Sequence, residues 1–471
     1  STDAQVLIAM AHVWDALARS PGAMRVWLAK DQVYALVRDD MLGSLEALPD
    51  TVQAPLLRAV VRCVDATRDG PQASAEHVRS LYYPLIVQAA QARMNAAALA
   101  PSPLSIQSAL ALWCALAEAA DPSTSGLVHV HLCTQLPAMT ALVSHQAAQA
   151  DVQITAMQAM HALLRAAPDL DAAVLPDLAR YTFVLLESAH ACLGNVRDAD
   201  ATQESVIVTY LHVVEELVRA CTEAPMLHTW CLRALEIMAP VLSLDVLRIP
   251  SISEALATLI HAMLIILRPA LFASAEGAEA VPNLAAPFDE PCFTRMPAFQ
   301  LVVRASMYLI GTCDARTESV ASAVAQGLGY VAEGLPSLTR PCPAVQVVMD
   351  DAIRQLCLLV FLRPMQPAML TPLILALRRT VLSRLDAHAL GGAETLLPSL
   401  AASCHTPAYR AAVEQAMQHV WESRAPPPVP APTPVMTARM QAKAEQAAAL
   451  ALNRTLRPLV QHARQTLRLH T

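Results

Sequence analysis

The stretch ESVIVTYLHVVEELVRAC, residues 204–221, decides the fold class of this chain. Its apolar residues recur at intervals of three and four, which is the period of an α-helix, and its charged residues lie largely off that stripe. The four residues from Val206 to Thr209 are β-branched and favour a strand by composition, but the run is too long for a strand and its period is helical. Val206 and Val213 lie outside the main stripe, so we expect neighbours to cover this helix on more than one side.

Segments of the same kind follow one another along the chain, each roughly 14 to 24 residues long, with short breaks that contain Pro, Asp or Gly. Ser or Thr followed by Pro marks several helix starts, because the hydroxyl caps the helix and proline suits its first position. These pairs are Ser20-Pro21, Ser102-Pro103, Thr371-Pro372 and Thr406-Pro407. Ser251 and Glu254 have the pattern of a capping box, which predicts a helix from there to about Phe272. No segment alternates convincingly like a strand, so the sequence predicts an all-α fold of roughly 18 to 20 helices.

The spacing of these helices indicates a repeat architecture. One helical pair occurs for roughly every 45 to 50 residues, near the ~40–47 period of two-helix repeats. On this spacing, on the apolar stripes and on the prolines at pair boundaries, residues 2–424 resemble the armadillo/HEAT helical-repeat superfamily. The resemblance implies a right-handed α-solenoid of stacked helix pairs. The chain has only four Asn, so the Trp-and-Asn array of importin-alpha-like armadillo proteins is absent and that subtype is set aside.

Composition divides the chain into five parts. We expect an N-terminal helical-repeat block over residues 1–272 and a C-terminal block over residues 298–424. A Pro-rich and acidic insertion, 273–297, separates them, and polar loops of this length are usually functional or mobile. The stretch 425–434 contains alternating prolines and predicts a stiff, extended spacer. Residues 435–471 form a basic, helix-prone tail.

The tail differs most from the rest in charge. It carries six basic residues against the single acid Glu445, a net charge of +5, which leaves −12 for the rest of the chain. We expect it to dock on the acidic solenoid or in an acidic groove of a partner through charge-assisted contacts. Pro458 should stop or kink its helix. The candidate partner-binding residues are Arg454, Arg457, Arg464 and Arg468.

No sequence pattern indicates an active site. Gly327, Gly329 and Gly334 have the wrong spacing for a dinucleotide-binding loop and follow a helical pattern. Neither a phosphate-binding loop nor a nucleophile elbow is present. We therefore expect no catalytic residue, no cofactor and no small-molecule substrate.

Two groups of residues are candidates for metal binding, and neither is complete. Glu187 and His190 match the Glu-x-x-His of di-iron bundles, which needs a second such pair and two further Glu. His129, His131 and Cys133 stand at alternate positions, which converge only in an extended segment and spread apart on a helix. We expect no metal site.

Charge and hydropathy exclude several classes of partner. The chain has 55% hydrophobic residues, 4% aromatic residues and a net charge of −7, so its body lacks the basic face and stacking rings of a nucleic-acid binder. Only the basic tail could contact phosphates. The charge-free windows 94–117 and 122–150 contain Pro, or Ser, Thr, Gln and His, so we expect no membrane span. Eleven scattered cysteines without a Cys-x-x-Cys motif fit reduced thiols and a cytoplasmic or nuclear location.

These observations favour a non-enzymatic scaffold or adaptor that binds a protein partner on its helical-repeat surface, as a subunit of a multi-subunit complex. Two alternatives remain. The chain could be a regulatory chaperone or nucleotide-exchange factor for a GTPase, or a fragment of a HEAT-type nuclear transport receptor.

Overall fold

A computed structural model describes most of the chain, and every regular element in the described part is a helix. The all-α prediction is therefore confirmed, and the helix labels run to α21, close to the expected number. The expected insertion at 273–297 lies outside the described residues, as does the spacer 425–434 apart from Pro434. The described residues are 2–43, 45–69, 72–120, 126–166, 173–194, 199–222, 227–268, 270–272, 298–313, 317–337, 343–363, 366–387, 391–424 and 434–468.

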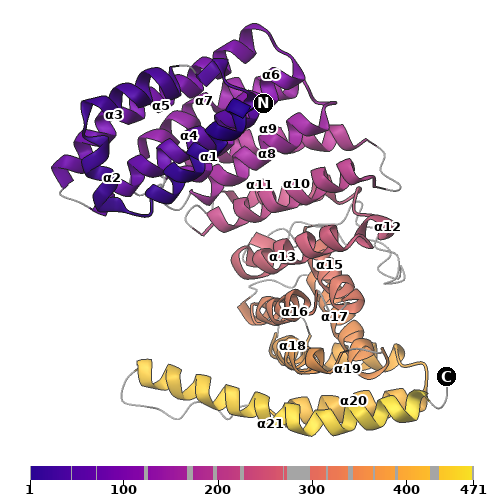
Figure 1. Ribbon diagram of the computed structural model, residues 1–471. Helices are drawn as coiled ribbons and strands as arrows, with labels where there is room; N and C mark the ends of the chain where they lie inside the picture. Colours follow the sequence, from indigo (N-terminus) through magenta and orange to yellow (C-terminus); the bar gives the residue numbers. More distant parts are fainter. Residues whose placement is uncertain are drawn as a thin grey trace. The chain divides into compact units, whose positions relative to one another are not determined.

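The chain divides into two compact units, Ser1–Val241 and Leu242–Thr471, and Figure 1 colours their helices along the sequence. The helices of the N-terminal unit are α1 (Thr2–Leu17), α2 (Pro21–Leu28), α3 (Asp31–Ala35), α4 (Asp50–Asp65), α5 (Gln72–Leu99), α6 (Pro103–Ala119), α7 (Gly126–Ser144), α8 (Ala150–Arg165), α9 (Leu175–Leu193), α10 (Ala201–Ala220) and α11 (His228–Met238).

The N-terminal unit is a two-layer stack of helix pairs. Helices α1, α4, α6, α8 and α10 pack in succession in one layer, and α5, α7, α9 and α11 pack in succession in the other. Successive pairs begin at Asp50, Pro103, Ala150 and Ala201, about 50 residues apart, as the sequence predicted. Helix α10 is packed by α8, α9 and α11. Its residues Val206 and Val213 are buried, as expected for a helix with neighbours on more than one side.

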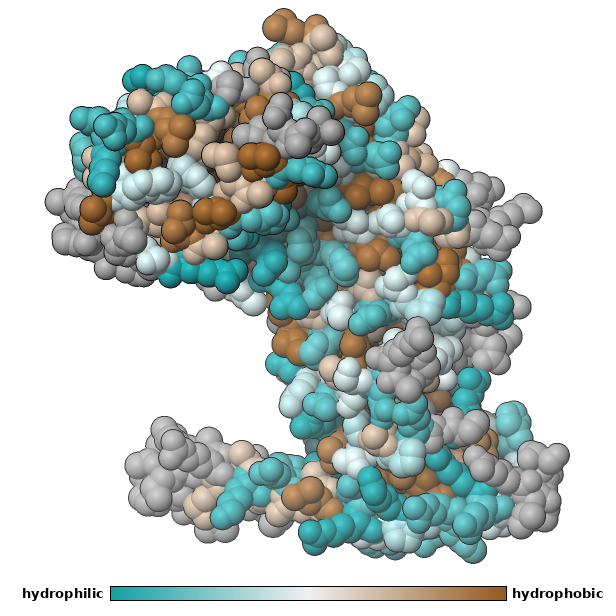
Figure 2. Space-filling model, viewed as in Figure 1, coloured by the Kyte–Doolittle hydropathy of each residue, from teal (hydrophilic) through white to brown (hydrophobic). Residues whose placement is uncertain are grey.

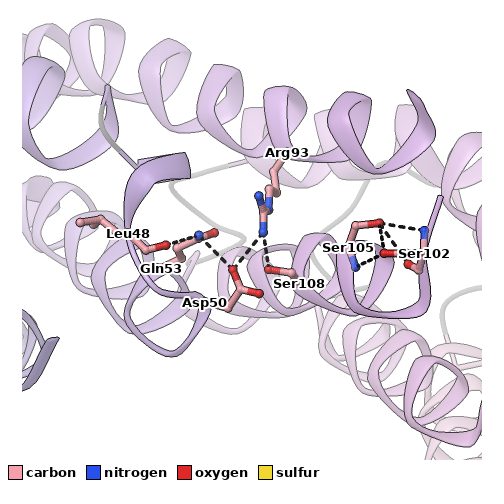
Figure 3. Close-up of polar contacts among 7 residues, drawn as sticks. All are labelled: Leu48, Asp50, Gln53, Arg93, Ser102, Ser105 and Ser108. Atoms are coloured by element: carbon pink, nitrogen blue, oxygen red, sulfur yellow. Dashed lines mark hydrogen bonds and ion pairs between the residues drawn. The ribbon is translucent and has the colours of Figure 1, made fainter. Parts of the chain in front are cut away.

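Polar contacts tie successive pairs together (Figure 3). Arg93 of α5 donates from Nη2 to Asp50 Oδ1 of α4 and to Ser108 Oγ of α6, at 2.9 Å in each case. Gln53 Nε2 donates to the Leu48 carbonyl at 2.8 Å, which fixes the turn that precedes α4. One arginine thus connects three helices of two adjacent pairs.

The helix starts partly follow the sequence expectation. Ser102 caps α6 and accepts a hydrogen bond from the Ser105 backbone, and Thr406 caps α20 in the same way through Tyr409. The cap expected at Thr371 is wrong, because α18 already begins at Pro367 and Pro372 lies inside it.

The capping box expected at Ser251 and Glu254 is also wrong. Helix α13 begins one residue earlier, at Pro250, with Ile249 in the cap position. It ends at Ile266 rather than near Phe272. In both of these misplaced starts an upstream proline occupies the first helical position and sets the boundary.

The C-terminal unit repeats the two-layer arrangement. Helices α13, α16, α18 and α21 pack in succession, while α15, α17 and then α19 and α20 form the second layer. Its helices are α12 (Leu244–Leu247), α13 (Pro250–Ile266), α15 (Ala298–Thr312), α16 (Glu318–Ala332), α17 (Pro343–Phe361), α18 (Pro367–Asp386), α19 (Gly392–Ala402), α20 (Pro407–Glu422) and α21 (Pro434–Arg468).

The glycines of α16 serve helix packing. A Cβ on Gly327 would lie 3.1 Å from Leu264 Cβ of α13, and a Cβ on Gly329 would lie 2.9 Å from Arg379 Cδ of α18. Both glycines therefore let α16 approach the neighbouring helices of its layer closely.

Candidate protein-docking site

The basic tail is the long helix α21, and it packs on the end of the C-terminal unit against α17, α18 and α20. The face of α21 toward these helices carries a stripe of buried apolar residues at helical spacing. These are Leu452, Leu456, Val460 and Ala463. Pro458, expected to stop or kink the helix, does not stop it, since α21 continues to Arg468. Leu456 and Val460 are buried on either side of this proline, so packing holds the helical backbone across it.

The four tail arginines have different surroundings. Arg464 donates to the Val360 and Leu359 carbonyls at 2.8 and 3.1 Å, at the C-terminal end of α17, where a cation is favoured by the helix dipole. Arg457 donates to Thr371 Oγ1 at 2.9 Å. Arg454 is exposed, and Arg468 belongs to the last turn of α21. In these contacts of Arg457 and Arg464 the acceptors are hydroxyl and carbonyl oxygens.

One ion pair between α21 and the rest of the unit has its charges the other way round from the expected contacts, with the acid on the tail and the base on the body. Glu445, the only acid of the tail, accepts a hydrogen bond from Arg378 Nη2 of α18 at 2.8 Å. Arg378 is buried and also donates to the Ser423 hydroxyl and carbonyl at the end of α20. A buried arginine of α18 therefore connects three helices, and the tail supplies its negative partner.

A pocket of about 670 Å³, with four charged side chains in its lining, lies beside this ion pair, between α16, α18 and α21. Arg379 stacks over the Tyr330 ring with its guanidinium 4.2 Å from the ring centroid, and it pairs with Glu333 at 3.2 Å. Burial raises the pKa of Glu333, and the nearby arginines oppose this shift. The two arginines and two acids of this pocket balance in charge, so it has no net attraction for an ion.

A second pocket, about 680 Å³ in volume, lies between α18, α19 and α20 and is mostly apolar. Leu397 of α19 and Trp421 of α20 are 50% and 49% exposed, although both belong to the lining. We call this pocket the α19–α20 groove. The rest of its apolar lining is Val381, Leu385, Leu396, Pro398, Leu400, Ala401, Cys404, Val413 and Met417.

The groove has a polar edge along α20. Arg410, Glu414 and Gln418 are exposed lining residues that follow one another at intervals of four, so they form one row on the helix. An apolar floor with a few polar groups at the edge is the usual composition of a ligand or peptide site, and the volume lies in the usual range. This site was not predicted from the sequence. Its one signal was Trp421, which stands outside the buried stripe of α20.

The residues considered for metal binding lie on two helices of the N-terminal unit. His129, His131 and Cys133 belong to α7, where His129 is buried and the other two are half-buried. Burial lowers the pKa of His131 and raises that of Cys133 to about 11. Glu187 and His190 lie on α9. In the described part of the chain, no three His, Cys, Asp or Glu side chains form a cluster that could hold a metal ion.

Among the described helices, none is both long and apolar enough to cross a bilayer.

Comparison with known proteins gives a structural likeness. No family model matches the chain, and no curated protein matches its sequence. A solved structure described as a circular tandem repeat protein with novel repeat topology and enhanced subunit contact surfaces aligns over 99% of both chains, with 14% sequence identity and a TM-score of 0.41. The two layers of helices in each unit define the fold of this chain as an all-α helical-repeat stack.

Proposed function

We propose that this chain is a non-enzymatic scaffold or adaptor that binds a protein partner on its helical-repeat surface, as a subunit of a larger assembly. The α19–α20 groove is the docking site, and the partner contributes an amphipathic α-helix. The pair spacing of about 50 residues supports an armadillo/HEAT-like solenoid, the class of protein that binds partners along stacked helices.

The observation that carries this proposal is the exposure of Trp421 and Leu397 at an apolar groove. Large apolar side chains exposed together mark interaction sites, and tryptophan is among the residues that dominate binding energy at interfaces. The Arg424 guanidinium lies 5.2 Å from the centre of the Trp421 ring, yet 49% of this side chain stays exposed beside the groove.

The dimensions of the groove favour a helical occupant. Its lining along α20 runs from Arg410 to Trp421, and eleven steps of about 1.5 Å correspond to three helical turns, or roughly 16 Å. A partner helix of that length presents anchors at i, i+4 and i+7, which is the usual pattern of helix-in-groove recognition. Arg410 and Glu414 lie at the edge of the groove. Because opposite charges attract, they favour a partner helix with an acidic residue near Arg410 and a basic residue near Glu414.

Affinity capture with a matched pair of variants tests this function. The full chain carrying Leu397→Glu and Trp421→Glu should fold, since both side chains are half exposed, but should recover partner proteins at least tenfold less well than the wild type. The control is Leu99→Glu on α5, where the leucine is 88% exposed and lies outside the groove. Equal recovery by all three proteins contradicts the proposal. A nucleotide-free GTPase recovered only by the wild type and the control would assign the exchange-factor class instead of the scaffold class.

A further inference from the structure

Helix α1 is the outermost helix of its layer in the N-terminal unit and packs on α4. Ala11 and Trp14 are buried on its inner side, and the Trp14 ring contacts Trp27 of α2 at 4.7 Å between centroids. The apolar surface of α1 extends beyond this buried face. Val6, Met10, Val13 and Leu17 are 55%, 37%, 57% and 37% exposed. We call these four residues the α1 stripe.

The α1 stripe lies along one side of the helix, because its members follow at intervals of four, three and four. Ala9 and Ala16, also exposed, border it on the side away from α4, whereas Asp15 is paired with Arg62 of α4. Figure 2 shows apolar side chains at the surface of the N-terminal unit, over the region where α1 runs in Figure 1. The stripe is thus a continuous apolar surface without a charged member.

The last helix of the C-terminal unit is built differently. The exposed positions in the C-terminal half of α21 are mostly polar, among them Arg454, Thr455, Arg457, Gln461 and Gln465, whereas the N-terminal half exposes Met440 and Leu450. Helix α1 has a surface typical of an inner helix of a stack, which is apolar beyond the face its neighbour covers.

We propose that the α1 stripe binds the α1 stripe of a second copy of this chain, with the two helices antiparallel about a twofold axis. The spacing of the stripe favours this occupant, because the sequence of intervals four, three, four reads the same in both directions. In an antiparallel pair Val6 lies opposite Leu17 of the other copy, and Met10 lies opposite Val13. All four residues of each copy are then covered in a single register, as an isologous interface requires.

Charge also favours a second copy over a charged partner. The stripe carries no ionisable side chain, so pairing it with itself brings no like charges together and leaves no buried charge without a partner. The antiparallel arrangement also sets the two helix dipoles in opposite directions.

The size of the stripe limits the strength of the dimer. A 16-residue helix is about 24 Å long, so covering one side of it in both copies buries on the order of 600 Å². Stable dimers bury roughly 1,200 Å² or more. The pair is therefore weak.

Sedimentation velocity of the full chain from about 1 to 500 µM tests this inference. We expect monomer at the low end and a growing dimer fraction at the high end. Val13→Glu should raise the dissociation constant at least tenfold, because it places a charge against Met10 of the other copy. The matched control is Val130→Glu on α7, where the valine is also half exposed. This variant should leave the dissociation constant of the dimer unchanged.

The register is tested by thiol trapping. Met10→Cys combined with Val13→Cys should give an intermolecular disulfide between positions 10 and 13 on oxidation with a copper catalyst and oxygen, identified by peptide mass spectrometry. The pair Val6→Cys and Val13→Cys should not be linked to each other in this way, because position 6 lies opposite position 17. A chain that stays monomeric up to 500 µM, or a dimer that Val13→Glu does not weaken, overturns the proposal and leaves the stripe to a different polypeptide.

Discussion

Glu445 of α21 and Arg378 of α18 form an ion pair, with 2.8 Å between Oε2 and Nη2. Arg378 is buried and Glu445 is half exposed, so the single acid of a basic tail meets a buried arginine of the body. A half-exposed ion pair contributes little stability, typically below about 1 kcal/mol. We therefore expect the buried leucines and valine of α21 to supply most of the docking energy, with Arg464 adding its contacts at the end of α17.

This order of contributions is testable by hydrogen exchange. Leu456→Ala removes a fully buried side chain and should cost about 2 to 4 kcal/mol, which raises amide exchange over residues 452–463 by at least tenfold. Glu445→Gln should raise exchange in the same segment by less than tenfold, since Arg378 keeps its hydrogen bonds to Ser423. A larger effect of Glu445→Gln than of Leu456→Ala, especially one that disappears at high salt, would show that charge holds the tail.

The buried pair of Arg384 and Asp350 gives a second prediction. Arg384 Nε donates to Asp350 Oδ1 at 2.7 Å, both side chains are buried, and Arg384 also donates to Thr395 of α19. Arg384→Met should destabilise the chain by roughly 3 kcal/mol, because it leaves a buried carboxylate without its cation. Adding Asp350→Leu should restore part of that loss. Thermal unfolding followed by circular dichroism measures the stability of both variants. A double variant no more stable than Arg384→Met alone contradicts this prediction.

A third prediction concerns Gln300 of α15. Its side chain is buried, and among the described residues neither its Nε2 nor its Oε1 has a hydrogen-bond partner. Gln300→Met, which keeps the volume and removes the polar atoms, should stabilise the chain by about 1 kcal/mol or more. Gln153→Met is the matched control. It removes donation to the Val143 and Gln146 carbonyls and should destabilise. Denaturant unfolding measures both variants. A midpoint that falls as far for Gln300→Met as for Gln153→Met would contradict the prediction for Gln300.

The fourth prediction concerns pH. Burial, together with His212 and Arg165, lowers the pKa of His161 of α8, while Glu215 and Glu118 oppose this, and His161 Nε2 lies 3.7 Å from Glu216 Oε1. The unfolded chain takes up a proton at about pH 6.5 and the folded chain only at lower pH, so stability falls as the pH drops below about 6.5. Burial raises the pKa of Glu216, which has the opposite sign and acts nearer its ordinary pKa of 4.5.

His161→Gln should therefore reduce the loss of thermal stability between pH 7.5 and about 5.5. Burial also lowers the pKa of His131, His190 and His228, so part of the loss should remain. The exposed His12 provides the control variant His12→Gln. If the wild type and the His161→Gln variant have the same pH profile, the expected direction of this effect is wrong.

Local rules predicted the helices well and their boundaries less well. The Ser-Pro and Thr-Pro signals at Ser102 and Thr406 are correct, and each hydroxyl accepts a hydrogen bond from the backbone three residues further on. At Thr371 the same signal is wrong, since Pro367 stands four residues upstream and starts the helix first. Pro458 shows the limit of a local rule more clearly. Its cost to the helix is offset by buried neighbours on α17, α18 and α20, which a linear sequence does not reveal.

The candidate site was less predictable, because its parts come from separate helices. Leu397 and Trp421 stand 24 residues apart and line one groove because α19 and α20 both pack on α17 and α18. The tail arginines were selected for their charge, whereas the docked face of α21 consists of apolar residues that resemble any core stripe. Pair spacing and stripes predicted a stack of helices, but a surface site depends on which side chains the stack leaves exposed.

Hydrogen exchange with the captured partner tests the central claim, that this chain is an adaptor whose partner binds in the α19–α20 groove. Exchange is compared between the free full chain and the complex, with the Leu397→Glu and Trp421→Glu variant as the reference for lost binding. We predict slower exchange on binding in residues 392–402 and 407–422, and no such change in the variant. Partner binding that leaves both segments unprotected, and that the variant retains in full, would contradict the claim.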